Sequence, residues 1–268
     1  MKVSHEVPRC LLKASQEFND YDYCLPHLLD QDEEYKQYFL DAKKEGRYIV
    51  MDNSLHELGE AYKWDRLKHW LYELKPNEFI VPDEWMDYNQ TAVYAKYWKQ
   101  IPMPDDCTAM AVVQGKNLID AIKSFRGLKD LGYEKIAISY GATWYNDLFP
   151  HNNKDLGKAL GRLNFIGELV KSGELDKYDK IHLLGCSVPQ EFGWYRDFNF
   201  IKSIDTSNPV MAALEGIMYK ESGLLEKPKA NMNDHFNIDF KNVDYLMVLH
   251  NTTLFREING IKKVNSYV

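Results

Sequence analysis

Residues 108–139 read TAMAVVQGKNLIDAIKSFRGLKDLGYEKIAIS. The apolar run from Thr108 to Val113 predicts a buried strand, and Lys135 to Ser139 predicts a second one. Between them, Asn117 to Leu131 has apolar residues at helical spacing. A strand, a helix and a strand in this order predict two parallel strands joined by a crossover helix.

The same alternation continues along the whole chain and predicts eight strands. The other six are Val7 to Leu12, Tyr21 to Pro26, Arg47 to Met51, Glu78 to Val81, Lys180 to Gly185 and Phe200 to Ile204. Further helices are predicted at Leu58 to Leu74, Thr91 to Gln100 and Leu156 to Ser172, with Gly173 as a stop for the last. This pattern favours a single α/β domain over residues 1–268, a (β/α)8 TIM barrel with a C-terminal helical segment at about 243–260, although an open doubly wound sheet gives a similar pattern.

Composition and charge restrict the functional classes. The 268 residues are 45% hydrophobic, which is enough for the core of one barrel. The net charge is −7, so contact with nucleic acid would require a local basic patch. The cysteines lack metal-ligand spacing, and no signal peptide or long apolar segment is present, so we expect a cytoplasmic protein with reduced thiols, no metal, no cofactor and no membrane contact. These cysteines are Cys10, Cys24, Cys107 and Cys186.

Polar residues and glycines follow the predicted strands. They are Asp52, Asp83, Gln114, Tyr140 with Gly141, Gly185 and Asp205. Any one of them could be a turn or helix-cap residue. Because the carboxyl ends of barrel strands meet at one face, the set as a whole predicts an active site there.

Six segments, in this order, resemble motifs of the tRNA-guanine transglycosylase family. They are YIVMDNSLH (48–56), FIVPDE (79–84), AVVQG (111–115), IAISYGA (136–142), LLGCSVP (183–189) and LHN (249–251). The resemblance covers nearly the whole chain in pattern, with weak identity. It implies exchange of a guanine base at the C1′ carbon of a nucleotide.

The resemblance also implies a role for each strand-end residue. Asp52 corresponds to the general acid/base, and Asp83 and Gln114 correspond to the residues that read the edge of guanine. Tyr140, Gly141 and Gly185 lie in segments beside the base. His56 and Leu184 correspond to the positions that sandwich it.

Two departures from the family pattern bear on mechanism and substrate. Ungapped alignment places the family's nucleophilic aspartate on Asn208, so we assign the nucleophile to Asp205, the carboxylate at that strand end. The family's zinc-binding insertion has no counterpart here. Short, zinc-free versions resemble phage and bacterial enzymes that place 7-deazaguanines, such as 7-cyano-7-deazaguanine, in DNA.

Other interpretations stay open from the sequence. The chain could act on tRNA without zinc, it could be a non-catalytic nucleic-acid-binding subunit, or it could be a hydrolase that uses Asp52 and Asp205 on a sugar. Contacts to phosphate would come from basic residues near the rim, and the candidates are Arg162, Arg196, Lys202 and Arg256. His182 and Glu84 also lie near the rim, without an assigned role.

Overall fold

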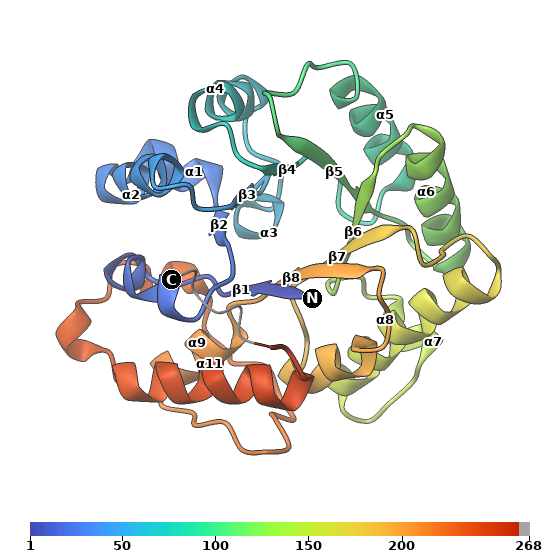
Figure 1. Cartoon of the computed structure of the whole chain (residues 1–268). Helices are drawn as coiled ribbons and strands as arrows, with labels where there is room; N and C mark the ends of the chain where they lie inside the picture. Colours follow the sequence, from blue (N-terminus) through green and yellow to red (C-terminus); the bar gives the residue numbers. More distant parts are fainter. Residues whose placement is uncertain (263–268) are drawn as a thin grey trace.

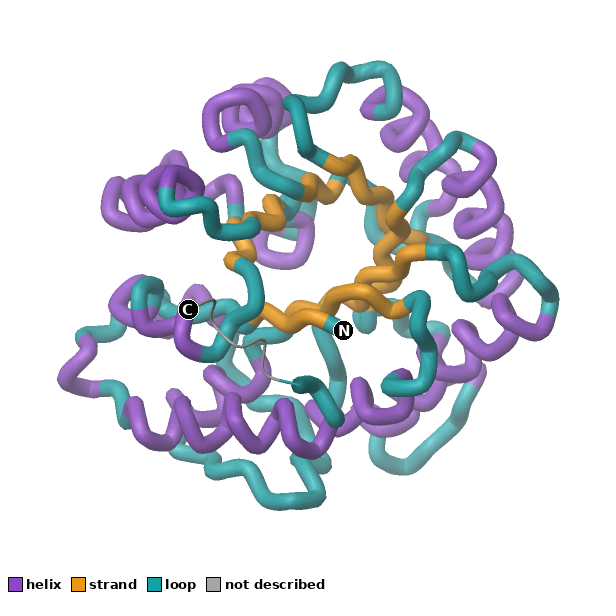
Figure 2. Tube along the Cα trace, viewed as in Figure 1, coloured by secondary structure: helices purple, strands orange, loops and turns teal. Residues whose placement is uncertain are grey.

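Eight parallel strands form a nearly closed barrel in the computed structural model, which describes residues 1–262 (Figures 1 and 2). The strands follow the order β1-β8-β7-β6-β5-β4-β3-β2 around the barrel, so the predicted (β/α)8 fold is confirmed. They are β1 (Lys2–Ser4), β2 (Asp22–Cys24), β3 (Ile49–Met51), β4 (Glu78–Ile80), β5 (Thr108–Val113), β6 (Lys135–Ser139), β7 (Lys180–Leu184) and β8 (Ile201–Asp205).

Most of the helices surround the strands on the outside of the barrel, whereas the short helix α3 lies within the ring of strands in this view (Figures 1 and 2). They are α1 (Pro26–Gln31), α2 (Glu33–Lys44), α3 (Leu55–Leu58), α4 (Trp64–Leu74), α5 (Tyr88–Trp98), α6 (Leu118–Asp130), α7 (Tyr145–Leu148), α8 (Lys154–Lys171), α9 (Asn208–Leu214), α10 (Met232–His235) and α11 (Tyr245–Asn259). The connections from β1 to β2 and from β7 to β8 contain 3-10 helices instead: η1 (Arg9–Leu11), η2 (Ala14–Glu17) and η3 (Pro189–Tyr195), while η4 (Phe240–Asn242) precedes α11. No helix within residues 1–262 is long and apolar enough to cross a membrane.

The first predicted strand, Val7 to Leu12, is wrong. Pro8 has no amide proton to donate to a ladder, and the residues after it form η1. Leu11 and Leu12 are nevertheless buried, because a 3-10 turn also directs apolar side chains into the core. The actual first strand, β1, pairs with β8, with Ser4 opposite Asp205. The other seven predicted strands are confirmed to within two residues at each end.

Asp20 and α11 complete the barrel between β1 and β2, which do not pair with each other. The Val3 amide donates to Asp20 Oδ2 (2.8 Å), and the Asp20 amide donates to the Val3 carbonyl (2.9 Å). From α11, Arg256 donates to Asp20 Oδ1 (2.9 Å) and to the Phe18 carbonyl (2.7 Å). Arg256 is therefore a buried structural residue, and the prediction that it contacts phosphate is wrong.

Two glycines of α8 test the packing of this helix against α7. A β-carbon on Gly161 would lie 2.2 Å from the Tyr145 carbonyl oxygen, whereas one on exposed Gly167 meets nothing within 4 Å. We expect Gly161→Ala to lower the free energy of unfolding by about 1–3 kcal/mol through overpacking. Gly167→Ala should raise it by about 0.5–1 kcal/mol through helix propensity. Urea unfolding of both variants measures the difference, and equal effects would contradict the packing of α8 on α7.

Candidate active site

A pocket of about 340 Å³ opens among the carboxyl ends of the strands. All predicted site residues except Gly141 line it. They are Asp52, His56, Asp83, Gln114, Tyr140, Leu184, Gly185 and Asp205. Residues that lie far apart in the sequence meet here because every strand of a parallel barrel ends at the same face.

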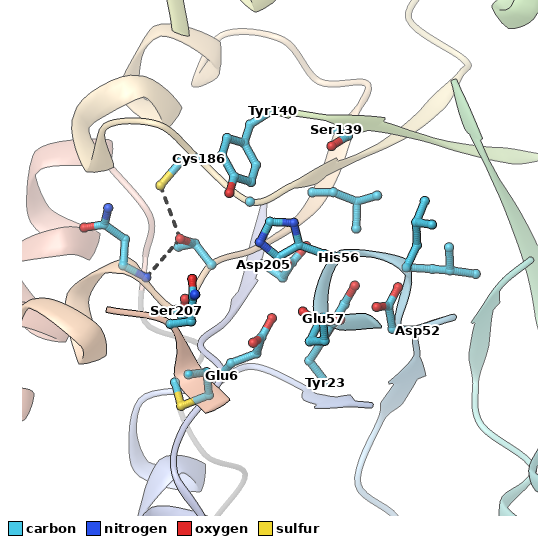
Figure 3. Close-up of a pocket in the computed structure, with 18 of the residues that line it drawn as sticks. Glu6, Tyr23, Asp52, His56, Glu57, Ser139, Tyr140, Cys186, Asp205 and Ser207 are labelled. Carbon is cyan, nitrogen blue, oxygen red and sulfur yellow. Dashed lines mark hydrogen bonds between the residues drawn. The ribbon is translucent and has the colours of Figure 1, made fainter. Parts of the chain in front are cut away.

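Four carboxyl groups line one part of this pocket. Asp52 and Asp205 are joined by Glu6 and Glu57, which the sequence analysis did not identify. Figure 3 shows the side chains of Glu6, Glu57 and Asp205 gathered in this part of the pocket. Glu6 lies two residues after the end of β1, so the wrong prediction of the first strand also missed its position at the rim. Glu57 lies in the single-turn helix α3 that follows Asp52.

These carboxyl groups hold protons more tightly than they would in water. Burial, reinforced by the charges of Asp205 and Asp52, raises the pKa of Glu6 to about 8. Burial raises the pKa of Asp205 to about 7, and burial together with Asp205 raises that of Asp52 to about 6. Burial also raises the pKa of Glu57. Near neutral pH, the pocket therefore contains both ionised and protonated carboxyl groups.

Asp83 is held by two amide groups at the edge of the pocket. Gln114 Nε2 donates to its Oδ2 (2.6 Å), and Asn53 Nδ2 donates to its Oδ1 (2.7 Å). The Met86 amide donates to Gln114 Oε1 (2.8 Å), which fixes the orientation of that side chain. Asp83 does not cap a helix, since Asp87 caps α5. Burial raises the pKa of Asp83 to about 7, against the two amide donors, which lower it.

Flat side chains form the walls of the pocket. The His56 ring lies 6.3 Å from that of Trp85 and 6.0 Å from that of Tyr140, between centroids. Gly141 lies behind this wall, where a β-carbon would approach the Trp85 ring to 2.2 Å. Gly185 has φ +59°, and a β-carbon there would lie 2.4 Å from the Tyr140 ring. Both glycines therefore make room for aromatic side chains.

Asp205 and Asn208 occupy different parts of the same pocket. Asp205 is the last residue of β8, and its Oδ1 lies 2.9 Å from His182 Nε2. Asn208 is the first residue of α9, and its Oδ1 accepts a hydrogen bond from the Tyr219 hydroxyl. Its amide nitrogen Nδ2 is buried and has no hydrogen-bond partner in residues 1–262. Asn208 therefore contributes an amide donor, and Asp205 contributes the carboxylate.

None of the four basic residues predicted as candidates for phosphate contact lines the pocket. Arg162 is fully buried, and it donates to Glu191 Oε1 (2.6 Å) and to the carbonyls of Leu184 (3.0 Å) and Gly185 (2.9 Å). It therefore supports the rim from behind, and the prediction that it contacts phosphate is wrong. Arg196 and Lys202 are exposed outside the pocket. Among described residues, Lys227 is the one lysine or arginine that lines the pocket.

Neither a scan of protein-family models nor a search of curated proteins gives a match to this chain. Within residues 1–262, no group of three or more His, Cys, Asp and Glu side chains is arranged to hold a metal ion. The interpretation of the pocket therefore depends on its own residues: a carboxyl cluster, a carboxylate–amide edge and flat walls.

The raised pKa of Glu6 predicts a pH-dependent effect on stability. Between its ordinary pKa of 4.5 and about 8, the folded protein keeps a proton that the unfolded chain loses, so this group lowers stability as the pH rises. Glu6→Gln should therefore raise the melting temperature by roughly 2–4 °C at pH 8.5, which corresponds to a gain of about 1 kcal/mol in the free energy of unfolding. At pH 4.5 the melting temperature should change little. Calorimetry at both pH values checks this, with Glu257→Gln on the exposed face of α11 as the control. An equal gain at both pH values would contradict the assignment.

Proposed function

We propose that this protein is a base-exchanging glycosyltransferase that replaces guanine in DNA by a 7-deazaguanine. The observation that carries the proposal is the combination, in one pocket, of a carboxyl cluster with a carboxylate–amide edge and flat walls. The cluster suits chemistry at a glycosidic carbon, and the edge suits a guanine-type base. A sugar hydrolase would need the first of these and would have no use for the second.

In the first half-reaction, Asp205 is the nucleophile. Its carboxylate attacks C1′ on the face opposite the base, a C1′–O bond forms, and the bond from C1′ to N9 of guanine breaks. The electron pair of that bond leaves with the base, and a neighbouring carboxyl group donates a proton to it. Asp52 is assigned this role, with Glu6 as a second acid in the same cluster.

The second half-reaction reverses these steps with a different base. The nitrogen of the incoming 7-deazaguanine that corresponds to N9 loses its proton to Asp52 and attacks C1′. The ester to Asp205 breaks, and the carboxylate is regenerated. Two displacements at one carbon retain the configuration of the sugar.

Asp83 and Gln114 supply the selectivity for guanine-type bases. The Asp83 carboxylate can accept from the ring N–H and the exocyclic amine, and the second N–H of Gln114 can donate to the O6 carbonyl. Adenine presents the opposite groups along this edge, and each unpaired polar group in a closed pocket costs about 1–3 kcal/mol. The flat rings of His56 and Trp85 offer stacking surfaces for the base.

DNA is the proposed polymer because the chain lacks a feature with which its tRNA-modifying counterparts bind RNA. The 268 residues lack the zinc-binding insertion with which the transglycosylases that they resemble would grip a folded tRNA. A net charge of −7 also favours modest, salt-sensitive binding. The guanine would leave the base stack to reach the pocket.

The test is the transfer of a labelled base. We expect labelled 7-cyano-7-deazaguanine to enter guanine-containing DNA, with release of one guanine for each label that enters. Asp205→Ala should reduce the exchange by at least a thousandfold, because no covalent intermediate can form. Denaturing gels should show a protein–DNA adduct only with the parent protein.

Each other outcome points to a different function. If the label enters tRNA but never DNA, the substrate is tRNA and the proposal of DNA is wrong. Guanine release without label entry would indicate a hydrolase. Exchange by Asp205→Ala at the parent rate would contradict the assignment of the nucleophile.

A further inference from the structure

A chain of buried, hydrogen-bonded side chains crosses the interior of the barrel and ends at Asp205. At the amino-terminal ends of β4 and β6, Lys135 Nζ lies 2.7 and 2.6 Å from the two carboxylate oxygens of Glu78. Lys135 Nζ also donates to Ser203 Oγ (2.7 Å). Ser203 Oγ lies 2.8 Å from His182 Nδ1, and His182 Nε2 lies 2.9 Å from Asp205 Oδ1.

The direction of these hydrogen bonds follows from Lys135. An ammonium group only donates, so the Ser203 oxygen accepts from it and directs its own proton to His182 Nδ1. A neutral His182 then carries its proton on Nε2 and donates it to Asp205. Burial, together with the charges of Lys135 and Arg162, lowers the pKa of His182 to about 3, against the opposing charge of Glu78. His182 also contacts Asp205, and its ring lies 6.4 Å from that of Tyr23 between centroids.

We infer that His182 is a positioning residue that holds Oδ1 of Asp205 and so orients this carboxylate in the pocket that it lines. This inference rests on the proposed function of Asp205 as nucleophile. The His182 proton stabilises the ionised carboxylate and restricts its rotation. Glu78, Lys135 and Ser203 fix the tautomer that makes this donation possible.

The test measures Asp205 directly and therefore does not require activity. Carbon-13 NMR of protein labelled at aspartate, assigned with Asp205→Asn, gives the titration midpoint of Asp205. We expect His182→Leu to raise that midpoint by about one pH unit, because the carboxylate loses a donor. His182→Gln, which can direct an N–H to the same oxygen, should restore part of the shift. Ser203→Ala should produce a smaller shift in the same direction, and it is the variant to use if His182→Leu does not fold.

Kinetics provide the second measurement. His182→Leu should reduce base exchange at pH 7 at least tenfold, with the KM for the free base changed less than twofold. The acidic limb of its pH–rate profile should move to higher pH. An unchanged midpoint in both His182→Leu and Ser203→Ala would overturn the inference. A shifted midpoint in a protein that exchanges no base would leave the positioning of Asp205 intact and would refute the proposed function instead.

A separate observation concerns two cations at the mouth of the pocket. Lys227 Nζ donates to the Tyr140 hydroxyl and lies 4.6 Å from the centroid of that ring. Lys158 Nζ, from α8, lies 5.9 Å from the same centroid. Neither ammonium forms an ion pair within 4.0 Å with a carboxylate in the described part of the chain. Two positive charges therefore share one tyrosine, and the carboxyl groups that influence them, Asp155 at Lys158 and Glu6 at Lys227, lie beyond ion-pair distance.

The segment that carries Lys227 is fastened to the start of α8. The Lys227 amide donates to Asp155 Oδ2 (3.0 Å), and Asn153 Nδ2 donates to the Leu225 carbonyl (2.7 Å). On the other side of the segment, Gln190 Nε2 donates to the Leu224 carbonyl (2.8 Å). These bonds hold Lys227 in place over Tyr140, next to the proposed base site.

We propose that Lys158, Lys227 and the Tyr140 hydroxyl form a subsite for a phosphate of the nucleotide whose base enters the pocket. This also rests on the proposed function. A phosphate here would pair directly with both lysines, and the tyrosine hydroxyl would give it a further hydrogen bond. It would also provide the local basic contact that a chain of net charge −7 needs to hold DNA.

Titration calorimetry with dGMP and with deoxyguanosine tests this subsite, because the two ligands differ only in the phosphate. The parent protein should bind dGMP about tenfold more tightly than deoxyguanosine. Lys227→Met should remove the preference for dGMP while its affinity for deoxyguanosine stays within twofold of the parent value. Lys158→Met should reduce the preference for dGMP. Lys171→Met, at the exposed far end of α8, is the matched control and should keep it.

Equal binding of the two ligands by the parent protein, or a preference that survives Lys227→Met, would overturn the subsite. Binding of inorganic phosphate or pyrophosphate that depends on Lys227, without binding of any guanine compound, would keep the subsite and refute the proposed function.

Discussion

Removing several carboxyl groups from water in one pocket is the constraint on which the rest of the site depends. An isolated buried carboxylate is costly, so each group must either keep its proton or gain hydrogen-bond donors. Asp83 has two amide donors, and Asp205 has His182. Glu6 has the charges of Asp205 and Asp52 nearby, and its pKa is the highest of the values given above. Different protonation states in one pocket therefore follow from differences in environment between chemically similar groups.

The barrel supplies these different environments through its register. Leu184 of β7 lies opposite Asp205 of β8, and His182 lies opposite Ser203, so His182 faces both of its partners on β8. The chain from Glu78 through Lys135 uses the barrel interior, where side chains from neighbouring strands meet in layers. Breaking such a buried pair by removing one partner would leave an uncompensated charge. The donor to Asp205 is thus anchored in the core of the fold rather than in a loop.

The sequence predicted the strand ends well because strand periodicity and the parallel barrel are sufficient to place them. β5 and β6 have the predicted bounds, and Asp52, Asp83, Gln114 and Asp205 line one pocket. The first strand was wrong because apolar residues can be buried by a 3-10 turn as well as by a strand, and Glu6 was missed with it.

The surroundings of the charged side chains were the least predictable feature from the sequence. Arg162 and Arg256 are buried and donate hydrogen bonds to carbonyls and carboxylates, a fact that depends on tertiary partners far away in the sequence. Lys227 lies in a segment without regular secondary structure, so no periodic pattern marked it as part of the pocket. Likewise, the sequence suggested complementary roles for Asp83 and Gln114, but not that their side chains bind each other.

Protonation also bears on how an acidic protein could hold a polyanion. At ionic strength near 0.15 M, charges more than about 8 Å apart are largely screened, so the repulsion that matters comes from carboxylates close to the bound nucleotide. The raised pKa values of Glu6 and Asp205 reduce that local negative charge near neutral pH. A phosphate beside Lys227 would act on the same groups, because its negative charge favours their protonated forms. In the proposed complex, substrate binding would thus help Glu6, the second acid of the cluster, to keep its proton, while the His182 donor offsets the same effect at Asp205.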